Sequence, residues 1–415
     1  MTKQNDAAHS DAAQSDAAQS DAAGAANRLV SSRVVVRRMR RQATGLAALA
    51  ALATLSLAAC GSDPTSASEQ PGGAEPGSSA NASGLACPAG KLSAEGSSAQ
   101  GNAITEVIVD YNAECGDKAT IEYNPTGSGA GIKSFYNGLV DFAGSDSALK
   151  TEAVDGVVEA DKAKERCQGN PAWNLPMVVG PIAFAYNVDG VDKLVLNAET
   201  LAEIFNGTIK TWNDPKIAKL NSGAKLPSAN ITVFFRSDES GTTENTTKFL
   251  SKAGNGAWKD EPAKAWTGTG DGKNKSSGVA EATANTKNSI TYIEWSYAKD
   301  NNLSMAQLDS GNGPVELTGD SVAKAVDEAK VKGSGNDLSL DLKYSGNKSG
   351  AYPALLVTYE IVCSKGLAAD KTAIVKDFLT YFSSSDAQQK LPDLGYAPLP
   401  SELESKVQSA VAAIQ

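Results

Sequence analysis

Residues 120–144 read TIEYNPTGSGAGIKSFYNGLVDFAG, and this stretch decides the fold class. The segment 120–123 is typical of a short strand, and 141–144 leads into another. Between them, apolar residues recur at i, i+3, i+4 and i+7, the spacing of one helical face: Ile132, Phe135, Tyr136 and Leu139. Strands that alternate with helices form a sheet covered by helices, so the stretch predicts an α/β protein.

The same alternation continues on both sides of this stretch. It predicts further helices at 103–111, 196–207, 373–382 and after Pro400, and further strands at 177–188, 231–237 and 352–362. In the helix at 196–207, Asn197 is a candidate N-cap and Gly207 a candidate stop.

The length of 415 residues exceeds what one hydrophobic core supports, because single cores stop growing at roughly 250 to 300 residues. We therefore expect two domains, with the chain crossing between them near Val178–Ala183 and again near Gly350–Leu356. This predicts a domain I built from 87–182 with 350–415, and a domain II built from 183–349.

The first 59 residues have the layout of an export signal. Several arginines precede the apolar stretch ATGLAALAALATLSLAA at 43–59, which is shorter than the roughly 20 residues of a membrane-spanning helix. The stretch ends in LAAC, which resembles the lipobox of bacterial lipoproteins, so we expect Cys60 to carry a lipid. A buried core helix is the alternative. Because the repeat DAAQSDAAQSDAA comes first, Met39 is a candidate for the true start.

The segment 60–86 is rich in Gly, Ser, Pro and Ala, which predicts a flexible tether behind the lipidated cysteine. The remaining cysteines are Cys87, Cys115, Cys167 and Cys363. Their even number and lack of metal-type spacing predict disulfides in an oxidising compartment. Four cysteines allow three pairings. We favour Cys87 with Cys115 and Cys167 with Cys363, but the sequence leaves the choice open.

Histidine content and charge exclude several classes of function. The only histidine is His9, so the chain from Cys60 onward cannot form a Ser-His-Asp triad, a His-based zinc site or a histidine phosphocarrier. From Cys60 the chain carries 31 basic and 44 acidic residues, a net charge of −13, which argues against a nucleic-acid surface. We expect no metal site, no cofactor and no enzymatic activity.

Three turns of small residues each precede a predicted helix: EGSSAQ at 95–100, TGSGAG at 126–131 and RSDESGTT at 236–243. Glycine lets the backbone approach a ligand, hydroxyls donate hydrogen bonds, and a helix N-terminus offers free N–H groups with positive dipole character. One such turn alone is more often a plain N-cap or loop. Three of them, one with an arginine and another followed by an aspartate at a strand end, favour an oxyanion site.

These turns lie in segments that resemble the phosphate-binding proteins of bacterial ABC phosphate importers. The resemblance runs from about Lys91 to Val411 in the family's order, through YNPTGSGAGIKSF, VDFAGSDSAL, LAEIFNGTIKTWNDPKI, RSDESGTTENTTKFL, SITYIEWSYAKDNNL and GYAPLP. It implies a two-domain periplasmic-binding-protein fold with two crossings. It also implies that a fully dehydrated phosphate lies in the cleft between the domains.

The resemblance assigns phosphate binding to Ser98, the amide of Ala99, Ser128, Asp146, Arg236, Ser240, Gly241 and Thr242. Asp146 is the acceptor in this set, and Asp238 orients Arg236. The sequence departs from the family where Ser98 replaces the usual threonine and where Pro125, in place of a frequent glycine, precedes the second turn. Neither change removes a required donor.

Asp146 gives a reason for a preference for phosphate. Near neutral pH phosphate still carries a proton, which a carboxylate accepts in a charge-assisted bond of roughly 1.5 to 3 kcal/mol, whereas sulfate has none to give. Arg236 donates in a planar geometry that matches phosphate oxygens, and Asp238 offsets its charge, so dipoles and hydroxyls can bind the anion despite the negative net charge. The alternatives are a helix cap at Asp146 and a surface ion pair at Arg236.

The expected function is high-affinity binding of inorganic phosphate and its delivery to the membrane subunits of an ABC phosphate permease. We expect hinge closure around the anion in a monomer that the lipid at Cys60 holds on the outer face of the cytoplasmic membrane. The alternatives are a binding protein for sulfate or molybdate, an exported phosphatase, and a surface adhesin with a vestigial cleft.

Two other features are assigned to structure. The segment GTGDGKNKSSG at 268–278 resembles a nucleotide-binding loop only superficially, because its spacing is too short and Asn274 replaces Ser or Thr. We therefore predict a flexible loop there. Trp266, Tyr292 and Trp295 are predicted to pack in the core or the cleft wall rather than to stack on nucleic-acid bases.

Overall fold

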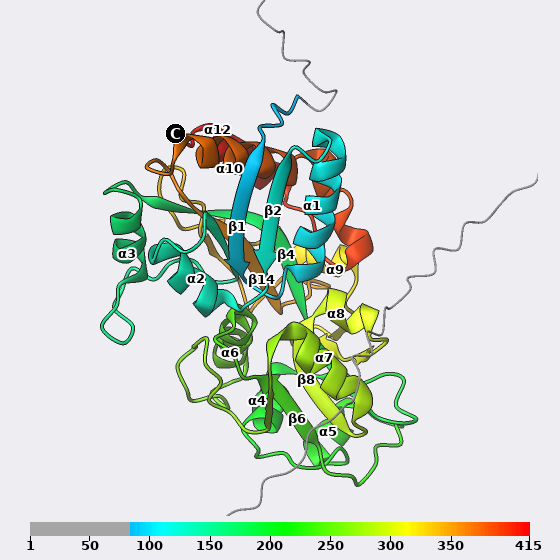
Figure 1. Ribbon diagram of the computed structural model, residues 1–415. Coiled ribbons are helices and arrows are strands. Elements are labelled where there is room, and N and C mark those ends of the chain that lie inside the picture. The colour runs from blue at the N-terminus through cyan, green and yellow to red at the C-terminus, as the bar shows by residue number, and fades with distance from the viewer. Residues whose placement is uncertain (1–83) are drawn as a thin grey trace, which may run out of the picture. The chain divides into compact units, whose positions relative to one another are not determined.

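The structure, a computed structural model, describes residues 84–415. These residues belong to the unit Ala74–Gln415, and the description below concerns them alone (Figure 1). The predicted leader, the start at Met39, the lipidated Cys60 and nearly all of the tether lie outside the described residues. Within residues 84–415, no helix is both long and apolar enough to span a membrane.

The main sheet has nine strands in the order β2-β1-β3-β14-β4-β8-β6-β7, with β9 paired to β4. Their bounds are β1 Gly90–Gly96, β2 Ala119–Asn124, β3 Phe142–Ser145, β4 Ala172–Asn187, β6 Thr232–Arg236, β7 Asp271–Lys273, β8 Ser289–Glu294, β9 Ser304–Met305 and β14 Leu355–Cys363. β1 runs parallel to β2 and β3, and β6 runs parallel to β7 and β8. β14 and β4 are antiparallel to their neighbours. The predicted α/β class is confirmed.

Strand β4 joins two parts of this sheet. Its residues up to Pro181 pair with β14, and those from Ile182 pair with β8. We call β1, β2, β3, β14 and residues 172–181 the first half-sheet, and residues 182–187 with β6, β7, β8 and β9 the second half-sheet. The change of partner lies inside the predicted crossing at Val178–Ala183 and agrees with a crossing there. The bounds of the two domains stay a prediction.

At the second predicted crossing, near Gly350–Leu356, part of the segment assigned to domain II already contacts the first half-sheet. A hairpin of β12 (Lys330–Val331) and β13 (Leu340–Asp341) lies in the segment assigned to domain II. Asp337, between its strands, accepts a hydrogen bond from the backbone N–H of Asn174 at 2.9 Å, and the N–H of Leu340 donates to the Tyr359 hydroxyl at 3.0 Å. This hairpin therefore contacts the first half-sheet before the chain reaches residue 350.

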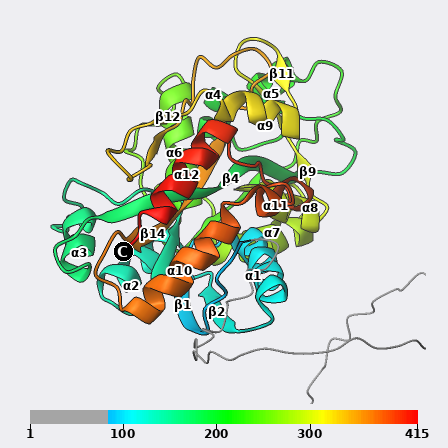
Figure 2. The same cartoon turned by 90° about the horizontal axis from the view of Figure 1, so that it is seen from above.

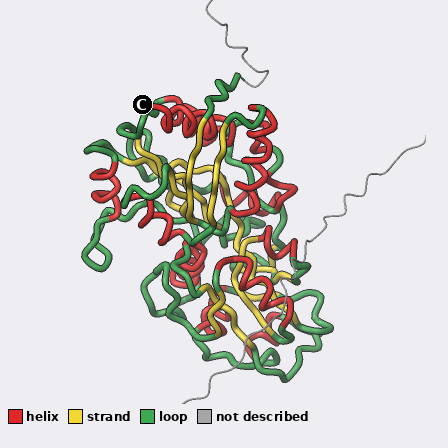
Figure 3. Tube along the Cα trace, viewed as in Figure 1, coloured by secondary structure: helices red, strands yellow, loops and turns green. Residues whose placement is uncertain are grey.

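Helices cover the sheet, and α10 and α12 lie side by side (Figures 2 and 3). The helices are α1 Gly101–Cys115, α2 Ser128–Tyr136, α3 Glu159–Arg166, α4 Ala198–Phe205, α5 Pro215–Leu220, α6 Gly241–Ala253, α7 Lys275–Asn285, α8 Trp295–Asp300, α9 Gly319–Val326, α10 Ala369–Phe382, α11 Ser385–Gln388 and α12 Ser401–Ala412, with a 3₁₀ turn at Leu391–Leu394. A small sheet joins β5 Val195–Leu196, β10 Gln307–Asp309 and β11 Pro314–Val315.

The predicted ends of α4 are confirmed. The side chain of Asn197 accepts a hydrogen bond from the N–H of Thr200 at 2.8 Å and forms a capping box with it. The helix ends at Phe205, and Gly207 follows with φ +80°, a left-handed conformation that glycine adopts without strain.

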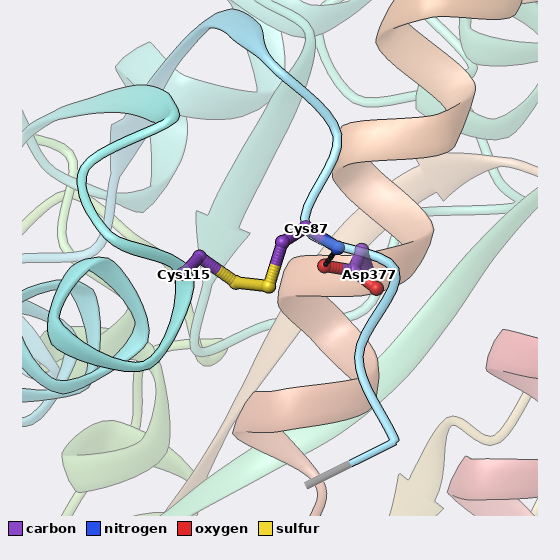
Figure 4. A group of neighbouring side chains, drawn as sticks. All are labelled: Cys87, Cys115 and Asp377. Carbon is purple, nitrogen blue, oxygen red and sulfur yellow. Dashed lines mark hydrogen bonds between the residues drawn. A yellow bond between two sulfur atoms is a disulfide. The ribbon is translucent and has the colours of Figure 1, made fainter. Parts of the chain in front are cut away.

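Disulfides join Cys87 to Cys115 and Cys167 to Cys363, which is the favoured pairing. Cys87, Cys115 and Asp377 lie close enough to suggest a metal site (Figure 4). However, both sulfurs belong to the disulfide, and the Asp377 carboxylate accepts bonds from the N–H of Cys87 at 3.0 Å and the Tyr111 hydroxyl at 2.9 Å. The group thus fastens the start of the described chain to α10.

Two predictions meet different outcomes in the second half-sheet. Tyr292 is fully buried, and its ring lies 5.1 Å from that of Trp266, so the packing role of these aromatic residues is confirmed. The prediction of a flexible loop at 268–278 is wrong, because this segment contains β7 and the first residues of α7. Its glycine-rich composition concealed a short parallel strand beside β6.

Candidate functional site

The three predicted turns lie where strands end and helices begin. β1 leads through the first turn into α1, the second turn leads into α2, and β6 leads through the third turn into α6. In the first half-sheet, β1 is parallel to β3 with Gly96 beside Gly144, so the first turn and Asp146 meet at one sheet edge. Ser98, Ser128 and Ser240 are all buried there.

Asp146 is almost fully buried and accepts hydrogen bonds at both carboxylate oxygens. Oδ1 accepts from Ser97 Oγ at 2.5 Å and from Thr358 Oγ1 at 2.7 Å, and Oδ2 accepts from Ser128 Oγ at 3.1 Å. Burial raises the pKa of Asp146 to about 6, although the bonds from Ser97 and Thr358 lower it. Asp146 is therefore a buried hydrogen-bond acceptor surrounded by hydroxyl donors. Ser97 and Thr358 were not anticipated from the sequence.

Arg236, at the end of β6, is held from two sides. Its Nε and Nη2 donate to the two carboxylate oxygens of Asp238 at 2.8 and 2.5 Å, the orienting contact that was predicted. Its Nη1 donates to Ser276 Oγ at 3.0 Å and reaches Thr242 Oγ1 at 3.4 Å. Although burial alone would lower it, the pKa of Arg236 is raised by Asp238, so the group remains charged.

Ser276 is a site residue that the sequence analysis missed. It is fully buried at the start of α7, where its hydroxyl lies 2.9 Å from Ser98 Oγ and accepts from Arg236. Its own N–H donates to Ser98 Oγ at 3.1 Å. Ser276 thereby connects the first turn to Arg236. The composition of 268–278 is that of a loop, and nothing in it indicates that Ser276 begins a helix at the site.

The first helical residue of α6, Gly241, lies against the second turn. A Cβ added at Gly241 would stand 2.5 Å from Asp146 Cβ and 2.6 Å from Ser128 Oγ, so a larger residue would not fit. Ser240 caps this helix by accepting from the N–H of Thr243 at 3.2 Å. The N-terminus of α6 is therefore next to Asp146, as an anion shared between them requires.

Besides Ser128, two more of the predicted donors are engaged within the protein. The N–H of Ala99 donates to Ser97 Oγ at 3.0 Å, and Thr242 donates its hydroxyl to Glu294. Glu294, at the end of β8, is fully buried, and its second oxygen has no hydrogen-bond partner among residues 84–415. Both donors would have to be shared with a bound anion.

The predicted residues thus converge on one place. Arg236 and several hydroxyls supply donors beside the N-terminus of α6, while Asp146 supplies an acceptor. Such an arrangement suits a small tetrahedral oxyanion that carries at least one proton.

Glu360, in β14, is another buried carboxyl group beside this site, in addition to Asp146 and Glu294. It is fully buried, opposite Gly144 of β3, and neither carboxylate oxygen has a well-formed hydrogen bond in the described part of the chain. Burial raises its pKa to about 8, the neighbouring Gln100 offsets part of this, and the charge of Asp146 adds to it. Glu360 is therefore largely protonated at neutral pH.

Glu360→Gln is expected to stabilise the fold by about 3 kcal/mol at pH 8. The pKa of Glu360 is about 8 in the folded protein and 4.5 in the unfolded chain. Below pH 4.5 the group is protonated in both states and does not destabilise the fold. As the pH rises from 4.5 to about 8, the unfolded chain loses this proton more readily, and the free energy of unfolding falls. Glutamine stays neutral and can donate to the unpaired Oε1 of Gln100. Urea unfolding at pH 5 and pH 8 measures the difference. Exposed Glu122 is the control, and a stability gain equal at both pH values would contradict the assignment.

Two relatives of this chain, named below, are both described as phosphate-binding proteins. A profile of the PBP superfamily domain matches residues 81–386. Phosphate-binding protein PstS2 of Mycobacterium bovis (strain BCG / Pasteur 1173P2) is 43% identical over 373 residues, covering 88% of this chain and 97% of that protein. Phosphate-binding protein PstS of Haemophilus influenzae is 32% identical over 308 residues, covering 72% and 86%.

Solved structures support the fold. A high affinity periplasmic phosphate-binding protein (PfluDING) bound with phosphate at pH 8.5 matches with a TM-score of 0.63 and 22% identity, over 77% of this chain and 93% of that one. A putative phosphate ABC transporter substrate-binding protein with bound phosphate, from Clostridium perfringens, matches with a TM-score of 0.55 and 19% identity, over 75% and 100%. The predicted periplasmic-binding-protein fold is confirmed, and the chain belongs to the PstS family of phosphate-binding proteins.

Proposed function

We propose that this protein binds inorganic phosphate outside the cytoplasmic membrane and delivers it to an ABC phosphate permease. The proposed ligands are Ser98, the Ala99 amide, Ser128, Asp146, Arg236, Ser240, Gly241 and Thr242, with Asp238 behind Arg236. Family membership at 43% identity over most of the chain supports this role. It requires binding and release only, with no catalysis and no cofactor.

The observation that carries the proposal is Asp146, a buried carboxylate that accepts hydrogen bonds from the hydroxyls of the first and second turns. A monoprotonated or diprotonated phosphate gives this carboxylate a proton to accept. Sulfate has no such proton and would meet a buried like charge with an unpaired acceptor, which is costly in a desolvated site.

Charge balance at Arg236 explains how an acidic protein can take an anion. Asp238 forms a two-bond ion pair with Arg236, so the pair has almost no net charge. Binding then depends on local hydroxyls, backbone N–H groups and the N-termini of α1, α2 and α6. These local donors, rather than the net charge of −13 after Cys60, would then decide whether the anion binds.

Export and anchoring complete the proposal. Two disulfides support a location outside the cytoplasm, where oxidising conditions preserve them. We extend this to a monomer tethered by a lipid at Cys60 to the outer face of the cytoplasmic membrane. The permease subunits would receive the closed, phosphate-loaded form.

Isothermal titration of the purified protein with phosphate, arsenate and sulfate tests the function. We expect phosphate and arsenate to bind, because both retain a proton near neutral pH, and sulfate to bind at least a hundredfold more weakly. Equal binding of sulfate would favour a general oxyanion carrier. Turnover of a phosphate monoester by the same preparation would indicate an exported phosphatase.

A further inference from the structure

The five residues from Asp146 to Lys150 are held against α6 by contacts outside the proposed ligand set. Asp146–Lys150 follows β3 of the first half-sheet, whereas α6 follows β6 of the second. Two adjacent residues of α6, Glu244 and Asn245, make these contacts, and both are almost fully buried. We call this set of contacts the α6 clamp.

Glu244 contributes the charged part of the α6 clamp. Its carboxylate accepts from Ser147 Oγ at 2.9 Å and from Lys150 Nζ at 2.6 Å, both on the segment that follows β3. The same carboxylate pairs with Lys248 Nζ at 2.7 Å, one turn along α6 itself. Burial raises the pKa of Glu244, but Lys248, Lys150 and Lys264 outweigh it and lower the pKa to about 2. Glu244 is therefore ionised at neutral pH.

Asn245 contributes the neutral part. Its side-chain amide donates to the carbonyl oxygen of Asp146 at 2.7 Å and to that of Gly241 at 2.9 Å. Its Oδ1 accepts from the Tyr344 hydroxyl at 2.6 Å. One side chain thus ties the proposed phosphate acceptor, Asp146, to the first residue of the helix whose N-terminus faces it.

The α6 clamp lies beside a cavity of about 770 Å³ that Lys150, Lys248, Glu244 and Asn245 help to line. About a third of each lysine side chain is exposed, 32% for Lys150 and 33% for Lys248, so dissolved ions can screen both pairs. The Glu244–Lys150 and Glu244–Lys248 pairs differ in which parts of the protein they join. The Lys150 pair joins the two half-sheets, and the Lys248 pair stays within α6.

We propose that Glu244 and Asn245 are positioning residues that hold the segment Asp146–Lys150 against α6 while phosphate is bound, and so set the rate of phosphate release. The inference rests on the proposed phosphate-binding function. When the half-sheets separate, the Lys150, Ser147 and Asp146 contacts break together, whereas the Lys248 pair remains. The α6 clamp therefore opposes opening, and it affects dissociation more than association.

The test compares Lys150→Met with Lys248→Met, which remove partners of the same carboxylate at nearly equal distance and exposure. Each purified protein is loaded with ³²P-phosphate and chased with unlabelled phosphate, and retained label is followed by rapid filtration. We expect dissociation to accelerate about tenfold in Lys150→Met and less than twofold in Lys248→Met. Association should change less than twofold in both.

Salt provides a second reading. Raising NaCl from low to molar concentration should accelerate release from the unmodified protein, and this dependence should be much weaker in Lys150→Met. Asn245→Leu should also accelerate release about tenfold, with a thermal unfolding curve confirming that it folds.

The outcomes distinguish a failure of the α6 clamp from a failure of the proposed phosphate-binding function. Equal release rates for Lys150→Met and Lys248→Met would overturn the α6 clamp while leaving phosphate binding intact. A slower association with unchanged dissociation would overturn it as well. Failure of the unmodified protein to retain any label would instead overturn the proposed function, and the α6 clamp with it.

Discussion

Replacing Asp146 with asparagine is expected to lower the preference for phosphate over sulfate by about a thousandfold, roughly 4 kcal/mol. Two effects combine. Phosphate loses a charge-assisted bond to the carboxylate, and sulfate no longer meets a buried negative charge. The asparagine Nδ2 can even donate to a sulfate oxygen. Titration of phosphate and sulfate into both proteins at pH 7.5 measures the ratio.

The pH dependence of this preference provides the control. Burial raises the pKa of Asp146 to about 6 in the protein without ligand, so its carboxyl group takes up a proton as the pH falls through that value. The unmodified protein should then discriminate less against sulfate at pH 5 than at pH 7.5. The asparagine variant should show no such change between these values. If Asp146→Asn kept both its phosphate affinity and its rejection of sulfate, the acceptor role would be wrong.

The parts of the fold that depend on local pattern were predictable. The helix predicted at 131–140 is α2, which runs from Ser128 to Tyr136 and buries Ile132 and Phe135. The prediction is wrong at its end, because Leu139 lies beyond α2 and is 70% exposed. The end signals of α4 were equally local, because Asn197 bonds to a residue three positions away. The three glycine-serine turns could be identified because each combines a strand end, small residues and a helix start within a few residues.

The site residues that were missed depend on distant pairing. Thr358 reaches Asp146 across 212 positions of sequence, and it lies in a strand whose nine residues are all buried. From sequence, that strand is simply an apolar run, and nothing marks its two polar members, Thr358 and Glu360, as neighbours of the site. Ser276 was hidden for another reason, since a loop-like composition surrounds it. Sequence therefore located the helix N-termini and Asp238, but not Ser97, Thr358 and Ser276, which support Asp146 and Arg236.

The α6 clamp illustrates the same limit. Glu244 and Asn245 directly follow the third turn, so their positions on α6 were evident. Their partners Ser147 and Lys150 are almost a hundred residues away and come from the other half-sheet. Only the folded arrangement shows that one lysine on Glu244 joins the half-sheets and the other does not.

Arg236→Met is expected to weaken phosphate binding by about a thousandfold, or roughly 4 kcal/mol. The guanidinium has five N–H donors, of which two bond to Asp238, one to Ser276 and one, at 3.4 Å, to Thr242. Methionine removes all of these donors, including any left for the anion. It also leaves Asp238 as a partly buried carboxylate without its ion-pair partner, next to the place where the anion binds. Titration with phosphate measures the loss, and a thermal unfolding curve shows whether the variant is folded.

Arg236→Lys separates charge from geometry in this prediction. Lysine keeps the positive charge, but a single ammonium group cannot bond to both oxygens of Asp238 while also reaching Ser276 and the anion. We expect it to recover no more than about tenfold of the affinity that methionine loses. Full recovery would show that the site needs a positive charge rather than an oriented fork. In that case Asp238 would lower affinity by offsetting the charge, and Asp238→Asn would tighten phosphate binding instead of weakening it.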